Sequence, residues 1–129
     1  MIKPATLPLS GGRFVPFVYT IALEGEDLTD ATMEMHVRHA ADVGGDPLVD
    51  LDLAAANAQG LSFTVDTSGA EPVSTIQIRI NETTMEGMPA ADETGEDAVF
   101  AYDLQITRSG HPKAVFFRGT FTVEAGVTQ

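Results

Sequence analysis

The stretch that decides the fold is AYDLQITRSGHPKAVFFRGTFTVEAGVTQ, residues 101–129 at the end of the chain. Two runs rich in β-branched and aromatic residues flank the dipeptide Ser109-Gly110, a composition typical of two strands joined by a turn. With this dipeptide at the tip of a hairpin, three pairs share the core side: Leu104 with Val115, Tyr102 with Phe117, and Phe100 with Gly119. In this register Phe116 points outward, and the pattern predicts an exposed ring that is either a lone apolar residue on the surface or part of a contact patch.

The rest of the chain alternates apolar and polar residues with the same period of two. The alternating runs are 17–23, 33–38, 61–65 and 76–80, with a shorter run at 48–53. Turn-rich stretches of Gly, Pro, Asp and Asn separate them. Helical patterns are limited to 53–58 and 82–88, each long enough for about one turn. The sequence therefore predicts an all-β fold: an antiparallel, immunoglobulin-like β-sandwich of about seven strands that ends in a long C-terminal hairpin.

The chain is long enough for one domain with its own core, at 129 residues. We expect a single β-sandwich domain over 14–129, preceded by an extended N-terminal arm over 1–13 that contains Pro4 and Pro8. The arm is held in place only if another part of the structure contacts it.

The composition excludes several classes of function. There are 19 acidic residues against 7 basic ones, for a net charge of −12. Binding to nucleic acid needs clustered Lys and Arg, so we expect no nucleic-acid partner. No apolar run approaches the roughly 20 residues of a membrane helix, and the N-terminus has no export signal, so we expect no membrane partner.

The residues that could carry catalysis are few. The chain has no cysteine, and a serine or threonine nucleophile would need a histidine beside it. The three histidines, His36, His39 and His111, show no such spacing, and they do not predict a convergent zinc set. The absence of tryptophan argues against a carbohydrate site. We expect neither an enzyme nor a bound cofactor.

Calcium is the remaining alternative for a ligand. GDPLVDLDL brings Asp46, Asp50 and Asp52 close in sequence, and EGEDLTD offers four acidic residues over 24–30. Carboxylates from a folded loop are the ligands that calcium prefers, but neither stretch matches the D-x-[DN]-x-[DN]-G loop. A calcium-binding or carbohydrate-binding sandwich module stays an alternative.

Two stretches resemble a known group of proteins. EDLTDATMEMHVRH (26–39) resembles the D-L-T-G-A turn and alternating strand of small bacteriophage tail and baseplate β-sandwich domains, with Asp30 where glycine is usual. AVFAYDLQITRSGHPKAVFFRGTFTVEAGVTQ (98–129) is similar to their closing pattern: an aromatic-Tyr-Asp-Leu strand, a glycine turn, and a strand with an internal glycine that runs to a final Val-Thr.

The resemblance implies a non-catalytic structural protein of the virion, made in the host cytoplasm and placed in the tail, baseplate or neck. Its expected partners are copies of itself, in a ring or trimer, and other virion proteins. A capsid decoration protein is the alternative. The residues expected to make these contacts lie in the arm, in the 81–97 loop and in the last strand: Ile2, Pro4, Leu7, Pro8, Leu9, Met85, Met88 and Phe116.

Overall fold

The computed structural model describes residues 5–40, 44–93 and 95–126, and these residues fold almost entirely as β-strands. In chain order the elements are β1 (Ala5–Thr6), β2 (Leu9–Gly12), β3 (Phe17–Glu24), β4 (Thr32–Arg38), β5 (Val49–Asp52), β6 (Gly60–Asp66), β7 (Val73–Ile80), α1 (Glu82–Glu86), β8 (Ala98–Thr107) and β9 (Ala114–Glu124). Among the described residues, no helix is long and apolar enough to cross a membrane.

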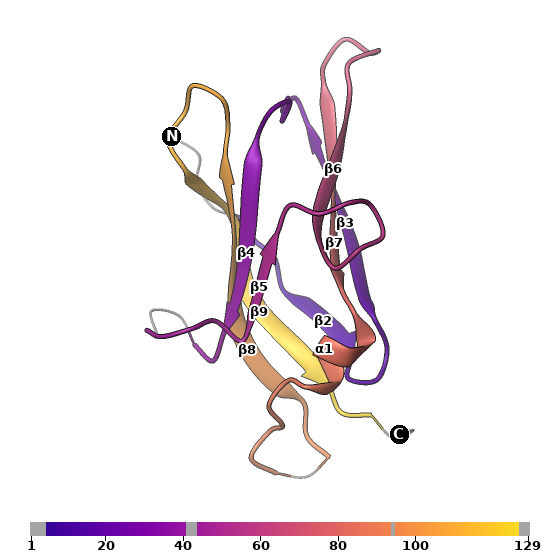
Figure 1. The fold of residues 1–129 in the computed structure, drawn as a ribbon, viewed down its shortest axis with the longest axis vertical. Coiled ribbons are helices and arrows are strands. Elements are labelled where there is room, and N and C mark those ends of the chain that lie inside the picture. Colours follow the sequence, from indigo (N-terminus) through magenta and orange to yellow (C-terminus); the bar gives the residue numbers. More distant parts are fainter. Residues whose placement is uncertain (1–4, 41–43, 94, 127–129) are drawn as a thin grey trace.

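Two sheets pack face to face (Figure 1). The larger sheet has the order β1-β9-β8-β4-β5, with β2 also paired to β9, and the smaller sheet has the order β3-β7-β6. The predicted all-β sandwich is confirmed, and β3 to β9 match the seven predicted strands. The immunoglobulin-like assignment stays a prediction.

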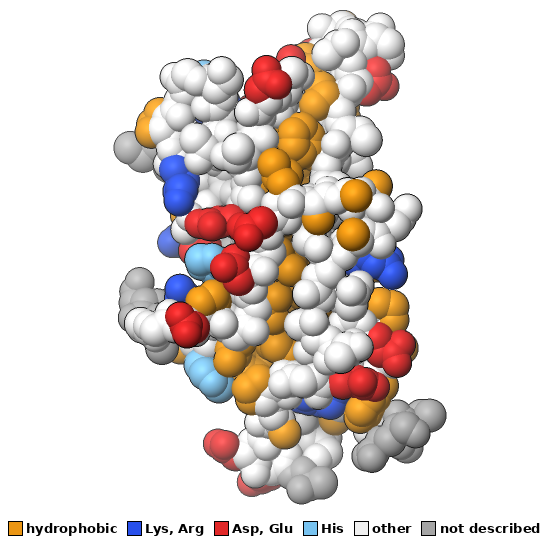
Figure 2. Space-filling model, in the orientation of Figure 1, with side chains coloured by type: hydrophobic (Ala, Val, Ile, Leu, Met, Phe, Trp, Pro, Cys, Tyr) orange, Lys and Arg blue, Asp and Glu red, His pale blue; other side chains and the backbone are white. Residues whose placement is uncertain are grey.

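The core lies between the sheets and follows from the alternation in the sequence. On β4, for example, Met33, Met35 and Val37 are buried, whereas Glu34 and His36 face outward. Burying a large aliphatic side chain contributes about 1.5–3 kcal/mol. The fully buried residues come from both sheets and from the connections between strands, and the largest are Phe121, Leu28, Met35, Leu51, Leu61, Ile76, Ile78, Ile80, Met85, Leu104, Ile106 and Val37. A band of hydrophobic side chains follows the seam between the sheets on the side shown in Figure 2.

The C-terminal hairpin forms, but the predicted register is wrong. The observed core-side pairs are Leu104 with Phe117, Tyr102 with Gly119 and Phe100 with Phe121, and the register shifts between Leu104 and Gln105. This β-bulge adds a residue to β9 and turns Phe116 inward, so that its side chain is 6% exposed. The prediction of an exposed Phe116 is therefore wrong, because a bulge lets two consecutive phenylalanines contact the core. The Arg108 guanidinium also lies 5.6 Å from the Phe116 ring centre.

Residues 5–12 of the predicted arm lie along the outer edge of β9. β1 and β2 run parallel to β9, with Ala5 opposite Phe117 and Leu9 opposite Phe121. At Leu7, which lies in the chain between β1 and β2, the backbone N–H donates to the Arg118 carbonyl of β9 at 2.9 Å. This segment therefore pairs with the free edge of β9.

Tyr102 and Gly119, which pair across the hairpin, hold this edge segment at Leu7. The Tyr102 hydroxyl donates to the Leu7 carbonyl oxygen at 2.5 Å. At Gly119 a Cβ would lie 2.8 Å from that same oxygen, so a side chain there would collide with the edge segment. Desolvation raises the pKa of Tyr102 to about 12, and Tyr19 adds a smaller effect in the same direction. The Tyr102 hydroxyl therefore keeps its proton at neutral pH and donates a hydrogen bond to Leu7 of the edge segment.

A tight turn leads into β4 at the D-L-T-D-A stretch. The Ala31 N–H donates to the Leu28 carbonyl, and Asp30 has a φ of 63°. Positive φ is the conformation that glycine adopts most easily. The Asp27 carboxylate accepts hydrogen bonds from the Thr29 hydroxyl and N–H, which hold the pKa of that carboxyl below its usual value.

The two predicted helical stretches have different outcomes. α1 forms at Glu82–Glu86, where Met85 packs into the core, so this prediction is confirmed. The prediction of a helical turn at 53–58 is wrong, because the first two residues pair with β6 and 55–58 form a non-helical turn in which the Ala58 N–H donates to the Ala55 carbonyl. Leu53 forms a parallel bridge with Leu61, and the Ala54 N–H donates to the Leu61 carbonyl.

Candidate functional site

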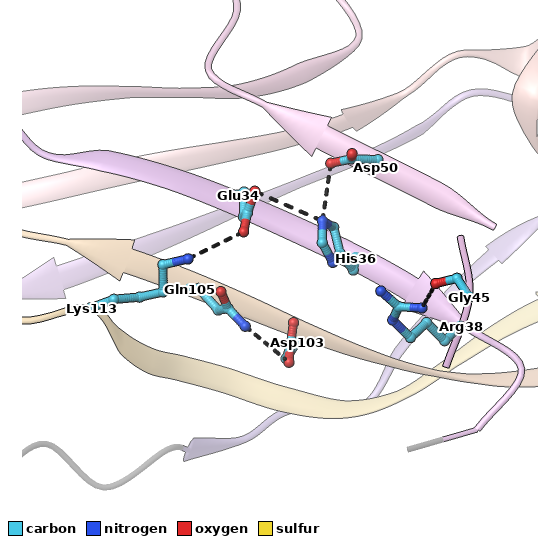
Figure 3. A network of polar contacts seen from close by, with 8 residues as sticks. All are labelled: Glu34, His36, Arg38, Gly45, Asp50, Asp103, Gln105 and Lys113. Carbon is cyan, nitrogen blue, oxygen red and sulfur yellow. Dashed lines mark hydrogen bonds and ion pairs between the residues drawn. The ribbon is translucent and has the colours of Figure 1, made fainter. Parts of the chain in front are cut away.

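The outer face of the larger sheet carries a network of charged and polar side chains (Figure 3). Because side chains alternate along a strand, Glu34, His36 and Arg38 all point outward from β4. The register of the sheet places Asp50 of β5 opposite His36 on one side and Asp103 of β8 opposite it on the other. A histidine therefore lies between two aspartates on adjacent strands.

The centre of this network is a cluster that we call the Glu34–His36–Asp50 cluster. His36 Nε2 lies 3.2 Å from Asp50 Oδ1 and 3.8 Å from Glu34 Oε2. One possible ligand atom from each of the three residues lies within 4.8 Å of the other two. The side chains of Glu34, His36 and Asp50 are 33%, 23% and 51% exposed. The cluster is therefore open to ions from solvent yet held by the pairing of β4 with β5.

Other charged and polar side chains surround the cluster, and one of them, Lys113, contacts it. Lys113 Nζ lies 3.5 Å from Glu34 Oε1, the oxygen that does not face His36. Beside it, Gln105 Nε2 donates weakly to Asp103 Oδ2 at 3.5 Å, and the Arg38 guanidinium donates to the Gly45 carbonyl. Exposed ion pairs contribute only about 0–1 kcal/mol each, so this network adds little to stability.

A shallow hollow of about 350 Å³ adjoins the cluster. Its lining includes Glu34 and Lys113 from the network, together with Asp52, which lies opposite Glu34 across β4 and β5. On the side of the molecule shown in Figure 2, acidic side chains gather beside a histidine over β4 and β5. The lining of the hollow thus holds two carboxylates against one ammonium group, an excess that favours the approach of cations.

The sequence did not reveal this cluster. The spacing of the histidines predicts no convergent ligand set, whereas the fold brings three possible ligands together: two stand two residues apart on β4 and the third comes from β5. Of the acidic residues considered for calcium, Asp50 belongs to the cluster. In the other stretch, Glu26 pairs with Arg108 at 3.2 Å and Asp27 accepts hydrogen bonds from Thr29.

Of the six residues expected to contact partners that the structure describes, four are buried within the chain. The side chains of Leu9, Met85, Met88 and Phe116 are at most 6% exposed, so they stabilise the core and offer little surface to a partner. In the edge segment, Leu7 is half-buried and Pro8 is exposed. Ile2 and Pro4 lie outside the described residues.

Comparison with known proteins gives no further assignment, since neither a protein-family model nor a curated protein matches the chain.

Proposed function

We propose that the chain is a non-catalytic structural component of a phage particle, placed in the tail, baseplate or neck. There it assembles with copies of itself and with neighbouring virion proteins. The resemblance of 26–39 and 98–129 to tail and baseplate domains supports the proposal, and the turn at 26–31 is the part of it whose backbone can be compared with the expected glycine turn. Asp30, which replaces the usual glycine, has the positive φ that a glycine would supply, so the substitution is compatible with the same turn.

The edges of the sandwich supply a physical route to assembly. β3 is the last strand of the smaller sheet, and it is eight residues long. Val18 and Tyr19 on this strand are 45% and 38% exposed, so two large apolar side chains of this edge strand are accessible to another chain. An edge strand presents backbone N–H and C=O groups with which a strand from another chain can pair. A neighbouring subunit can therefore extend the smaller sheet at β3.

Charge limits this assembly in free solution. At a net charge of −12, copies repel one another, and the repulsion weakens as salt screens it. We therefore expect self-association to increase with both protein concentration and ionic strength.

The assembly route is tested by light scattering over a series of protein and salt concentrations. Val18→Lys should reduce the molar mass of the assemblies, because a lysine on an edge strand opposes pairing. The matched control is Val99→Lys, which makes the same change at a valine that is 59% exposed but lies on β8, an inner strand of the larger sheet. Equal effects of the two substitutions would exclude β3 as the assembly edge.

The place in the particle is tested separately, by immunogold electron microscopy of particles from the phage that encodes the chain. Label at the tail, baseplate or neck is the expected result. Label over the shell would indicate a capsid decoration protein, and particles without the chain by mass spectrometry would overturn the assignment to the virion.

A further inference from the structure

The Glu34–His36–Asp50 cluster has a spacing close to that of a tetrahedral metal site. Zinc binds nitrogen and oxygen ligands at about 2.0–2.2 Å, so two ligand atoms on one tetrahedral ion lie about 3.3–3.6 Å apart. The separations from His36 Nε2 are 3.2 Å to Asp50 Oδ1 and 3.8 Å to Glu34 Oε2, one on either side of this range, and the ligand atoms of the three residues lie within 4.8 Å of one another. Small rotations of exposed side chains can bring all three atoms onto one ion.

The backbone already places the three ligands on one face. Glu34 and His36 are two residues apart on β4, so they share its outer side, and Asp50 is the direct cross-strand partner of His36. Metal binding would therefore need no change in the fold. It would join the short strand β5 to β4.

The chemistry of the three ligands favours one class of ion. Imidazole nitrogen suits zinc and other first-row transition metals, whereas calcium and magnesium prefer oxygen ligands alone. The two carboxylates together carry two negative charges, which balance a divalent cation. With three protein ligands, a fourth position of a tetrahedral ion is left for water or for a group from another molecule.

We propose that Glu34, His36 and Asp50 form a binding site for a divalent transition-metal ion of the zinc class. Lys113 acts against binding, because its ammonium group lies beside Glu34 and repels the incoming cation. The site is independent of the proposed place in a phage particle, since it requires only the folded chain.

The test is zinc binding to the untagged, full-length chain, measured by isothermal titration calorimetry after treatment with a chelator. We expect one zinc ion per chain and a melting temperature that rises with zinc, because an ion that binds only the folded state stabilises it. Cobalt(II) in place of zinc should give the visible absorption of a metal bound through nitrogen and oxygen.

Substitutions identify the ligands. His36→Gln should weaken zinc binding at least about ten-fold. Removal of a residue that only supports a metal ligand already costs about 10- to 100-fold in affinity, and His36 is a proposed ligand itself. His111→Gln is the matched control, because His111 lies in the exposed turn between β8 and β9 and is not part of the cluster. Lys113→Met should tighten binding about two- to five-fold, as expected for the loss of one exposed charge interaction.

Three outcomes would overturn the proposal. Zinc affinity that is equal in the parent chain and the His36→Gln variant would mean that zinc binds elsewhere on the acidic surface. Calcium affinity equal to that for zinc would show that the imidazole does not contribute. A melting temperature that zinc leaves unchanged in the parent chain would show that the cluster is only a network of surface ion pairs.

Discussion

Substitution of Gly119 by alanine tests how the edge segment is held on β9. The added Cβ would lie 2.8 Å from the Leu7 carbonyl oxygen and 3.1 Å from the Leu7 carbonyl carbon. Both atoms belong to the backbone, so a side-chain rotation cannot remove the collision. Either the strands stay together under strain, or the segment at Leu7 moves away from β9.

Both responses cost a similar free energy. Overpacking that shifts the backbone costs about 1–3 kcal/mol. Movement of Leu7 away from β9 breaks two hydrogen bonds, from Leu7 N–H to Arg118 and from the Tyr102 hydroxyl to Leu7, each worth about 0.5–1.5 kcal/mol. Replacement of glycine by alanine also reduces the conformational entropy of the unfolded chain, which stabilises the folded state by about 0.4–1 kcal/mol. We therefore expect Gly119→Ala to lower the free energy of unfolding by about 1–2 kcal/mol.

Urea unfolding followed by circular dichroism measures this change. The matched control is Gly44→Ala, because a Cβ at Gly44 has no heavy atom within 4 Å. Hydrogen exchange at the Leu7 amide should also become faster in the Gly119→Ala variant, since that N–H donates to Arg118.

A double-mutant cycle with Tyr102→Phe separates the two responses. If Leu7 moves away, its hydrogen bond to Tyr102 is already broken, so Tyr102→Phe should cost about 1 kcal/mol less in the Gly119→Ala background. A Gly119→Ala variant as stable as the Gly44→Ala control would refute the idea that Gly119 is required for the approach of Leu7.

Three further predictions concern other described contacts. Ser74→Ala should lower the free energy of unfolding, measured by urea unfolding, by about 1–3 kcal/mol. The fully buried hydroxyl accepts a hydrogen bond from the Leu28 N–H and donates one to the Glu26 carbonyl, and an unchanged free energy would contradict this role. Asp30→Gly should raise the free energy of unfolding by about 0.5–1 kcal/mol in the same urea experiment. It removes the strain of the positive φ, about 1–2 kcal/mol, but the glycine also gives the unfolded chain more conformational freedom. Asp30→Val should lower the free energy of unfolding. Burial raises the pKa of Tyr102 from its ordinary value of 10.0 to about 12, so the hydroxyl keeps its proton to a higher pH in the folded state than in the unfolded chain. The stability contributed by this difference is complete below pH 10.0 and is lost as the pH rises towards 12. Ultraviolet titration of a Tyr19→Phe variant checks this, and a folded chain with ionised Tyr102 at pH 10.0 would contradict it.

The strands could be predicted because alternation is a local property of the sequence. A sheet with one face buried needs an apolar residue at every second position, and β4 and β7 have this pattern throughout. The bulge at Phe116 could not be predicted in this way, since a period-two pattern assumes one constant register. Two adjacent phenylalanines in β9 were the available signal, because a regular strand would expose one of them.

The cluster depends on information that a local pattern lacks. Glu34 and His36 share a face of β4 by their spacing alone, which the sequence shows. Asp50 joins them only because β4 and β5 pair in one register, and the connecting sequence, residues 39–48, is too long for a two-residue turn to predict that register. Met85 shows the same limit: it was assigned to a contact loop, but one turn of helix directs it into the core.

The edge strands of the two sheets differ in how well they can pair with a strand from another copy. β9 is covered by the chain's own β1 and β2, so a strand from another copy would have to displace paired backbone and the buried Leu9. β5 has four residues, and short edge strands pair poorly with other chains. The start of β6 is already bridged by Leu53. β3 is thus the longest edge in the described part of the chain that lacks such protection, and the exposed Val18 lies on it. If assembly proceeds by strand addition, β3 is therefore the edge expected to pair with another copy, and the comparison of Val18→Lys with Val99→Lys tests this edge.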